Sequence, residues 1–98
     1  MQVETSHGLG DCVRIFQESV RKRPLRLKPF PFRCETPQIS GEMAIVTASF
    51  QIAEPYGSVR MQCERRDSVT VVHFFTAGNI RGRVTANSMA KRIAANLR

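Results

Sequence analysis

The sequence predicts an α+β fold: a single antiparallel sheet of four to five strands with an N-terminal and a C-terminal helix packed on one face. The first observation is the two-residue alternation from Glu42 to Glu54, which places apolar side chains on one side of a strand: Ala44, Val46, Ala48, Phe50 and Ile52. The second is the helical spacing of apolar residues near each end of the chain. The third is size, because 98 residues with 42% hydrophobic content build one modest core, which favours a single domain over residues 1–98.

The N-terminal segment predicts a helix from Asp11 to Lys22, and Val3 and Thr5 give a weak signal for a short strand before it. Asp11 is a suitable N-cap, because its carboxylate can accept hydrogen bonds from the free backbone N–H groups of a first turn. Pro24 ends the helix, since proline disfavours the helical conformation in the residue before it. The apolar side chains at helical spacing are expected to cover the sheet: Val13, Phe16 and Val20.

Pro24 to Pro31 reads as an extended connection that lies against the core. Three consecutive strands are then expected, at 30–35, 42–54 and 58–64, joined by short segments at 37–41 and 55–57. Gly41 and Gly57 mark these connections, because hairpin turns often need the positive φ that glycine adopts without strain.

The last third begins with Val69 to Phe75, which has strong strand propensity and precedes the turn signal Ala77-Gly78-Asn79. Ile80 to Val84 would then be a fifth short strand. Alternatively, Asp67 caps a helix that begins at Ser68. From Thr85 to Leu97 the apolar residues return to helical spacing, which predicts a C-terminal helix as the second cover of the sheet.

Charge is the most informative part of the composition. The formal net charge is +7 with a pI near 10.4, and no acidic side chain follows Asp67. This favours an anionic partner such as a lipid surface or a nucleic acid, although a basic surface can also serve solubility alone. No apolar run approaches the 18 residues of a membrane span and no signal sequence opens the chain, so a cytoplasmic protein is expected.

No constellation of residues predicts catalysis or a cofactor. The cysteines, Cys12, Cys34 and Cys63, are odd in number and widely spaced, which is typical of reduced buried thiols, and they form no metal-binding spacing with His7 or His73. His73 lies in a hydrophobic run, where a core histidine is commoner than a catalytic one. A binding or regulatory module is therefore expected rather than an enzyme.

Several stretches resemble the kinase-associated C-terminal domain of serine/threonine kinases related to the AMP-activated kinase. They are the first helix, Leu-Arg-Leu-Lys at 25–28, Phe-Pro-Phe-Arg-Cys-Glu at 30–35, the strand 42–52, Ser-Val-Arg-Met-Gln-Cys-Glu at 58–64 and Arg65-Arg66-Asp67. The resemblance covers Gly10 to Val84. It implies a small antiparallel sheet with both helices on one face, binding to anionic phospholipids and, in several members, restraint of a kinase domain in the same or another chain. At Arg66 the sequence departs from the family, which usually has glycine there.

Two functional hypotheses and a third, more general one follow. In the first, the domain lies peripherally at the inner membrane surface, where a basic rim contacts anionic phospholipids: Arg21, Lys22, Arg23, Arg26, Lys28, Arg65 and Arg66. The resemblance implies the roles of Arg21, Lys22, Arg65 and Arg66. In the second, a sheet like that of TATA-box-binding domains contacts nucleic acid through Arg60, Arg81 and Arg83. The residues expected on its outer face include no aromatic side chain, which disfavours that alternative: Thr47, Ser49, Gln51, Arg60 and Gln62. In the third, the basic face docks an acidic protein partner.

Overall fold

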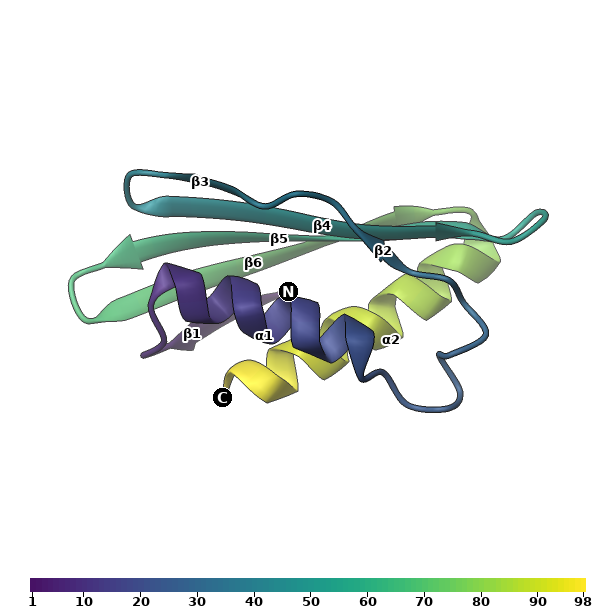
Figure 1. The fold of residues 1–98 in the computed structure, drawn as a ribbon, viewed down its shortest axis with the longest axis horizontal. Helices are drawn as coiled ribbons and strands as arrows, with labels where there is room; N and C mark the ends of the chain where they lie inside the picture. Colours follow the sequence, from purple (N-terminus) through teal and green to yellow (C-terminus); the bar gives the residue numbers. More distant parts are fainter.

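The computed structural model describes all 98 residues as a sheet with two helices on one face (Figure 1). The elements follow in the order β1 (Gln2–Thr5), α1 (Leu9–Arg21), β2 (Arg33–Cys34), β3 (Gln38–Ser40), β4 (Met43–Gln51), β5 (Tyr56–Arg66), β6 (Val69–Gly78) and α2 (Ile80–Leu97). The predicted class and the placement of both helices are confirmed.

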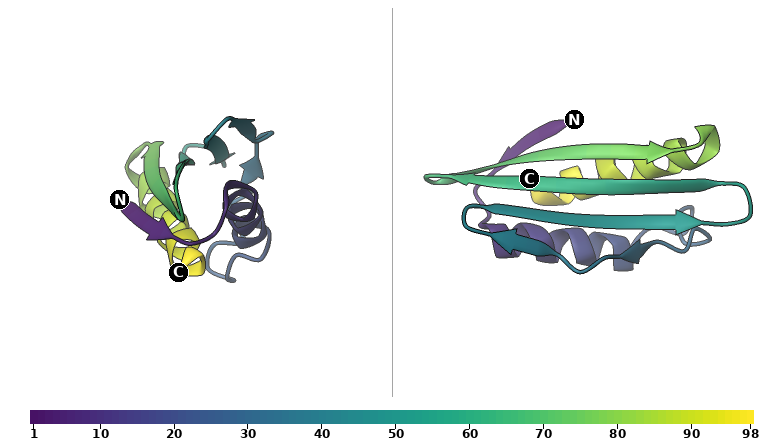
Figure 2. Two further views of the ribbon diagram at one scale, coloured as in Figure 1. Left: turned by 90° about the vertical axis from the view of Figure 1, so that its left-hand side faces the viewer. Right: turned by 90° about the horizontal axis from the view of Figure 1, so that it is seen from above.

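The sheet is larger than predicted, with six antiparallel strands in the order β1-β6-β5-β4-β2, and β3 also pairs with β4. The additional strands are short. β1 is a genuine edge strand on β6, and the segment expected to be a turn at 37–41 contains β3. Seen from above in Figure 2, no other element covers the outer face of the sheet, and both helices lie behind it.

The core forms between the helices and the inner sheet face. The alternation expected for the middle strand is confirmed from Ala44 to Phe50, whose apolar side chains are buried, whereas Ile52 lies beyond the end of β4 and is 38% exposed. Phe16 of α1 and Met89, Ile93 and Leu97 of α2 are fully buried against this face. The predicted amphipathic helices therefore do cover the sheet.

The first helix begins earlier than predicted. Gly8 occupies the N-cap position without a side-chain hydrogen bond, and Asp11 lies inside the first turn, where its carboxylate contacts Arg14 at 3.5 Å. The prediction that Asp11 caps the helix is therefore wrong, although an acidic side chain in the first turn still interacts favourably with the helix dipole.

The residues that follow β5 decide between the strand and the helix that the sequence left open after Asp67. Val69 to Phe75 belongs to β6, and Asp67 occupies the β5–β6 turn with φ 53° rather than capping a helix. The prediction of a fifth strand at 80–84 is wrong, because α2 starts at Ile80. Asn79 caps it: its Oδ1 accepts a hydrogen bond from Gly82 N at 2.9 Å.

Glycines allow α2 to approach the sheet closely. Gly41 has the expected positive φ of 59°, but Gly57 lies within β5 and does not, so that part of the prediction is wrong. A Cβ on Gly57 would contact the Gly82 carbonyl, and one on Gly82 would overlap the Tyr56 carbonyl oxygen. Gly57 is therefore needed for backbone contact between β5 and α2, not for a turn.

Candidate functional site: the basic helix layer

Charge is distributed very unequally between the two sides of the sheet. We define the helix layer as residues 9–32 and 80–98, which comprise α1, the α1–β2 connection and α2. It carries eleven of the 15 basic side chains and two of the eight acidic ones, a formal charge of +9. The remaining residues carry −2, which gives the +7 of the whole chain. The excess positive charge thus belongs to one side of the molecule.

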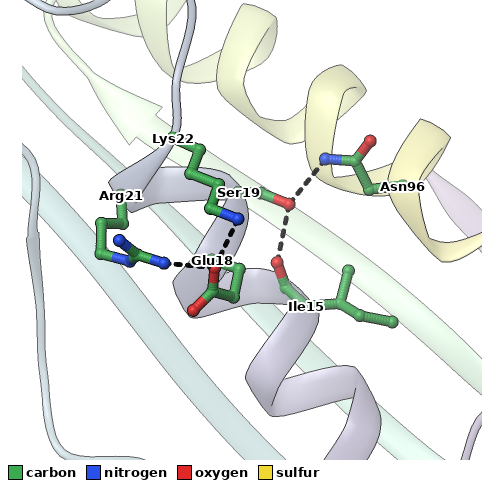
Figure 3. A network of polar contacts seen from close by, with 6 residues as sticks. All are labelled: Ile15, Glu18, Ser19, Arg21, Lys22 and Asn96. Carbon is green, nitrogen blue, oxygen red and sulfur yellow. Dashed lines mark hydrogen bonds and ion pairs between the residues drawn. The ribbon is translucent and has the colours of Figure 1, made fainter.

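A hollow of about 280 Å³ lies between the two helices of this layer. Arg14 and Lys22 of α1 and Arg92 of α2 line it, together with Ile15, Glu18, Ser19 and Asn96. Figure 3 shows the contact that joins the helices: Asn96 Nδ2 donates to Ser19 Oγ at 2.8 Å, and Ser19 Oγ donates to the Ile15 carbonyl at 2.7 Å. The hollow therefore has a hydrogen-bonded floor and three basic side chains around it.

Glu18 is the one acidic side chain of this hollow. Its carboxylate accepts a hydrogen bond from Arg21 at 2.6 Å and lies 3.4 Å from Lys22 Nζ (Figure 3). The hydrogen bond from Arg21, reinforced by Lys22, lowers the pKa of Glu18, so this carboxylate is ionised at neutral pH. Arg21 and Lys22 are both exposed and share this single counter-charge.

Three basic residues of the α1–β2 connection were predicted to face a lipid, and two are free to do so. The side chains of Arg26 and Lys28 are exposed and form no ion pair or hydrogen bond. Arg23 instead donates from Nη1 to the Val20 carbonyl at 2.8 Å and from Nε to the Leu27 carbonyl at 3.1 Å. Its guanidinium lies 5.9 Å from the Phe32 ring centroid, so Arg23 ties the end of α1 to the connection.

The remaining two predicted lipid contacts lie at the β5–β6 turn, away from the C-terminal end of α1 (Figure 1). Arg65 Nη1 donates to the carbonyl oxygens of Ser6 and His7, at 3.2 and 3.1 Å, and to Thr70 Oγ1 at 2.9 Å. Arg66 pairs with Glu64 at 3.0 Å, and this contact raises the pKa of Arg66. The structure therefore does not bring Arg65 and Arg66 together with Arg21, Lys22, Arg26 and Lys28.

Sequence reasoning missed two groups of residues in the helix layer. One is basic: Arg14, Lys91 and Arg92, all exposed. The other is apolar and exposed: Leu25 at 82%, Ile80 at 79% and Val84. The complete lack of acidic residues after Asp67 indicated that α2 is basic, but only the packing of α2 beside α1 shows that Arg92 joins the cations of α1. Lys91 lies on the other flank of α2, beside Met1 and Phe74.

The outer sheet face differs from the one predicted for nucleic-acid binding. Arg60 lies on it, whereas Arg81 and Arg83 belong to α2. The expectation that this face has no aromatic side chain is wrong, because Phe75 pairs with Arg60 in the register and is 53% exposed. His73, expected in the core, lies on the same face and stacks on Phe75 with ring centroids 6.5 Å apart.

The cysteines are free thiols in two different environments. Cys12 and Cys63 are fully buried, but Cys34 on β2 is exposed, which corrects the expectation that all three are buried. The hydrogen bond between Cys63 and Cys12 raises the pKa of Cys63, and burial raises it further. No group of three His, Cys, Asp or Glu side chains gathers in a geometry that could hold a metal ion.

Comparisons with protein-family models, curated proteins and solved structures find no match to this chain. Neither helix has the length and apolar character needed to cross a membrane.

Proposed function

We propose that this protein is a non-catalytic module that binds peripherally to anionic phospholipid membranes through its helix layer. The observation that carries the proposal is the separation of charge, +9 on the helix layer against −2 elsewhere. A surface of that sign is drawn to an anionic bilayer from about one Debye length, roughly 8 Å at physiological salt, and the concentration of positive charge in the helix layer orients the approach.

The unpaired cations provide the attraction at contact. Arg26, Lys28, Lys91 and Arg92 are exposed and form no ion pair. Each Lys or Arg near an anionic leaflet contributes about 1 kcal/mol, so four of them contribute roughly 4 kcal/mol before any apolar contact is made. Arg21 and Lys22 contribute less, because both are already partly neutralised by Glu18.

Exposed apolar side chains supply a second, short-range contribution. Leu25 stands between Arg23 and Arg26, and Ile80 and Val84 are one helical turn apart beside Arg81 and Arg83. Such side chains gain about 0.8 kcal/mol for each methylene that leaves water for the acyl boundary. Their exposure among cations fits insertion beneath a layer of lipid phosphates.

The hollow between α1 and α2 suits a single lipid headgroup. Arg14, Lys22 and Arg92 surround about 280 Å³, and the Asn96 amide, which uses only one of its two N–H groups on Ser19, provides a further donor below them. A phosphate oxygen accepts hydrogen bonds from several such donors at once. Glu18 limits the number of negative charges that fit there, which favours a monovalent headgroup over a multiply phosphorylated one.

The resemblance to kinase-associated C-terminal domains extends the proposal to regulation. As in several members of that family, the module would restrain a serine/threonine kinase domain in the same or another chain at the cytoplasmic face of a membrane, and lipid binding would compete with that restraint. The antiparallel sheet with both helices on one face agrees with the architecture that the resemblance implies.

Nucleic-acid binding by the sheet is the second candidate, because Phe75 beside Arg60 provides the stacking side chain that the sequence did not indicate. The strands of the sheet carry four basic and two acidic side chains, a formal charge of only +2 against the +9 of the helix layer, which disfavours it. A polyanion attracted to this protein would meet the helix layer first, so membrane binding remains the better-supported function.

Vesicle co-sedimentation at physiological salt tests the proposal. We expect binding to vesicles with phosphatidylserine and none to phosphatidylcholine alone. The Arg26→Ser/Lys28→Ser variant should bind roughly 30-fold more weakly, because two charges of about 1 kcal/mol each are lost. The matched control, Arg60→Ser/Arg66→Ser, removes the same charge from the sheet and should bind nearly as well as the unchanged chain. Equal losses in the two variants would contradict the proposal.

A further inference from the structure

A second hollow, of about 530 Å³, lies on the opposite side of the molecule, on the outer sheet face. Its floor is one row across the sheet, in which Arg33 pairs with Ser49, Ser49 with Ser58 and Ser58 with Ala77. Tyr56 and Gln51 pair with each other at one border of this row. The small side chains of the row create the depth, and Figure 2 shows that no helix or loop covers this face.

The hollow is lined by hydrogen-bond donors without partners. Arg33 forms no ion pair, and no side-chain hydrogen bond is made by Arg33, Ser49, Gln51, Tyr56 or Ser58. No acidic side chain lines the hollow, although the residues outside the helix layer carry six acidic and four basic side chains in all. One guanidinium among several hydroxyls and an amide suits an anion that also carries polar ring substituents.

Tyr56 is held rigidly at the border of the hollow. Its backbone N–H donates to Asn79 Oδ1 at 3.3 Å, and Asn79 Nδ2 donates to the Glu54 carbonyl at 2.7 Å. Gly78 and Gly82 both approach the Tyr56 carbonyl so closely that neither position has room for a Cβ. These contacts fix the backbone position from which the half-exposed phenol ring projects, and the ring is open to stacking by an incoming ring.

We propose that this hollow binds a nucleoside monophosphate, with the phosphate on Arg33 and the serine hydroxyls and the base or ribose against Tyr56. The volume is within the range of pockets that hold ligands of this size. The site is independent of membrane binding, because it lies on the sheet face and shares no residue with the helix layer except Pro31. A nucleotide could thus be bound while the helices contact a lipid surface.

Titration of the isotopically labelled chain with adenosine monophosphate, followed by amide chemical shifts, tests this site. We expect a saturable change with a dissociation constant below about 1 mM, confined to β2, β4, β5 and β6 near the hollow. Arg33→Gln should weaken binding at least about tenfold and Tyr56→Leu should also weaken it, whereas Arg26→Gln, in the helix layer, should not. The dispersion of the same spectra shows that each variant is folded.

Two further titrations separate the parts of the ligand. Inorganic phosphate and adenosine should each bind much more weakly than the nucleotide, because each engages only half of the hollow. Phosphate binding as tightly as the nucleotide would overturn the proposal in favour of a simple anion contact. Absence of saturation, or an Arg33→Gln variant that binds unchanged, would also overturn it.

Discussion

At the scale of single residues, identical side chains have different roles according to where the fold places them. Arg23 and Arg26 are three positions apart, yet the first donates to backbone carbonyls and the second is free in solvent. Arg65 and Arg66 are neighbours, yet one is tied to the β1–α1 connection and the other only to Glu64. A sequence alone does not distinguish these roles, because the partners lie up to 59 positions away.

Arg65 should contribute to stability and Arg66 should not. Removing the Arg65 guanidinium leaves the carbonyl oxygens of Ser6 and His7 without this donor, so we expect Arg65→Met to lower the free energy of unfolding by about 2 kcal/mol. Arg66→Met breaks only an exposed ion pair and should change it by less than about 0.5 kcal/mol. Urea denaturation measures both, and equal effects would show that the Arg65 contacts are not structural.

The thiols provide a second test at this scale. One thiol, that of Cys34, should react with a disulfide reagent in the native protein, and all three should react after denaturation. Partial burial raises the pKa of Cys34, so its reaction rate should still be increasing with pH above about 9, where an ordinary cysteine levels off. Rapid native reaction of two or three thiols would contradict the packing of Cys12 and Cys63.

At the scale of elements, the position of α2 depends on its first turn. Asn79 caps the helix, Gly82 lies directly over the Tyr56 carbonyl, and Gly57 and Gly78 leave space on the strands below. The same contacts place Ile80 and Val84 in solvent and hold Tyr56 at the sheet-face hollow. Both proposed surfaces therefore depend on this one junction.

Gly82→Ala tests the junction. The new Cβ would overlap backbone atoms that cannot rotate away, so we expect a loss of about 3 kcal/mol or more in the free energy of unfolding. The matched control is Gly10→Ala in α1, where nothing lies within 4 Å of the added atom and the change should stabilise the helix by up to about 1 kcal/mol. Thermal and chemical denaturation show whether each substitution lowers or raises the free energy of unfolding.

Elements with strong periodicity were predictable and those that depend on distant partners were not. The alternation of β4 and the apolar spacing of α1 and α2 identified these elements to within a few residues. β3 was missed because its three residues are all exposed and give no alternation. The face of Phe75 was missed because Val69 to Phe75 is apolar on both sides, so only the pairing with β5 shows which side chains face out.

At the scale of the whole molecule, the net charge was predictable from composition, but the side of the molecule that carries it was not. Composition gives +7, but the assignment of +9 to one side requires that α1 and α2 pack side by side on the same sheet face. The rim expected from the sequence joined Arg65 and Arg66 to the end of α1, whereas the fold brings Arg14 and Arg92 together with Lys22 there. The proposed membrane binding therefore requires one orientation, with the helix layer towards the lipid.

A fluorescent label that reports its surroundings tests this orientation most directly. In a Cys34→Ser background, which leaves only the two buried thiols, the label is placed on Leu25→Cys in the helix layer or on Thr47→Cys on the outer sheet face. We expect phosphatidylserine vesicles to shift the emission of the label at position 25 to the blue and to leave the label at position 47 unchanged. A blue shift at position 47, or none at position 25, would contradict binding through the helix layer.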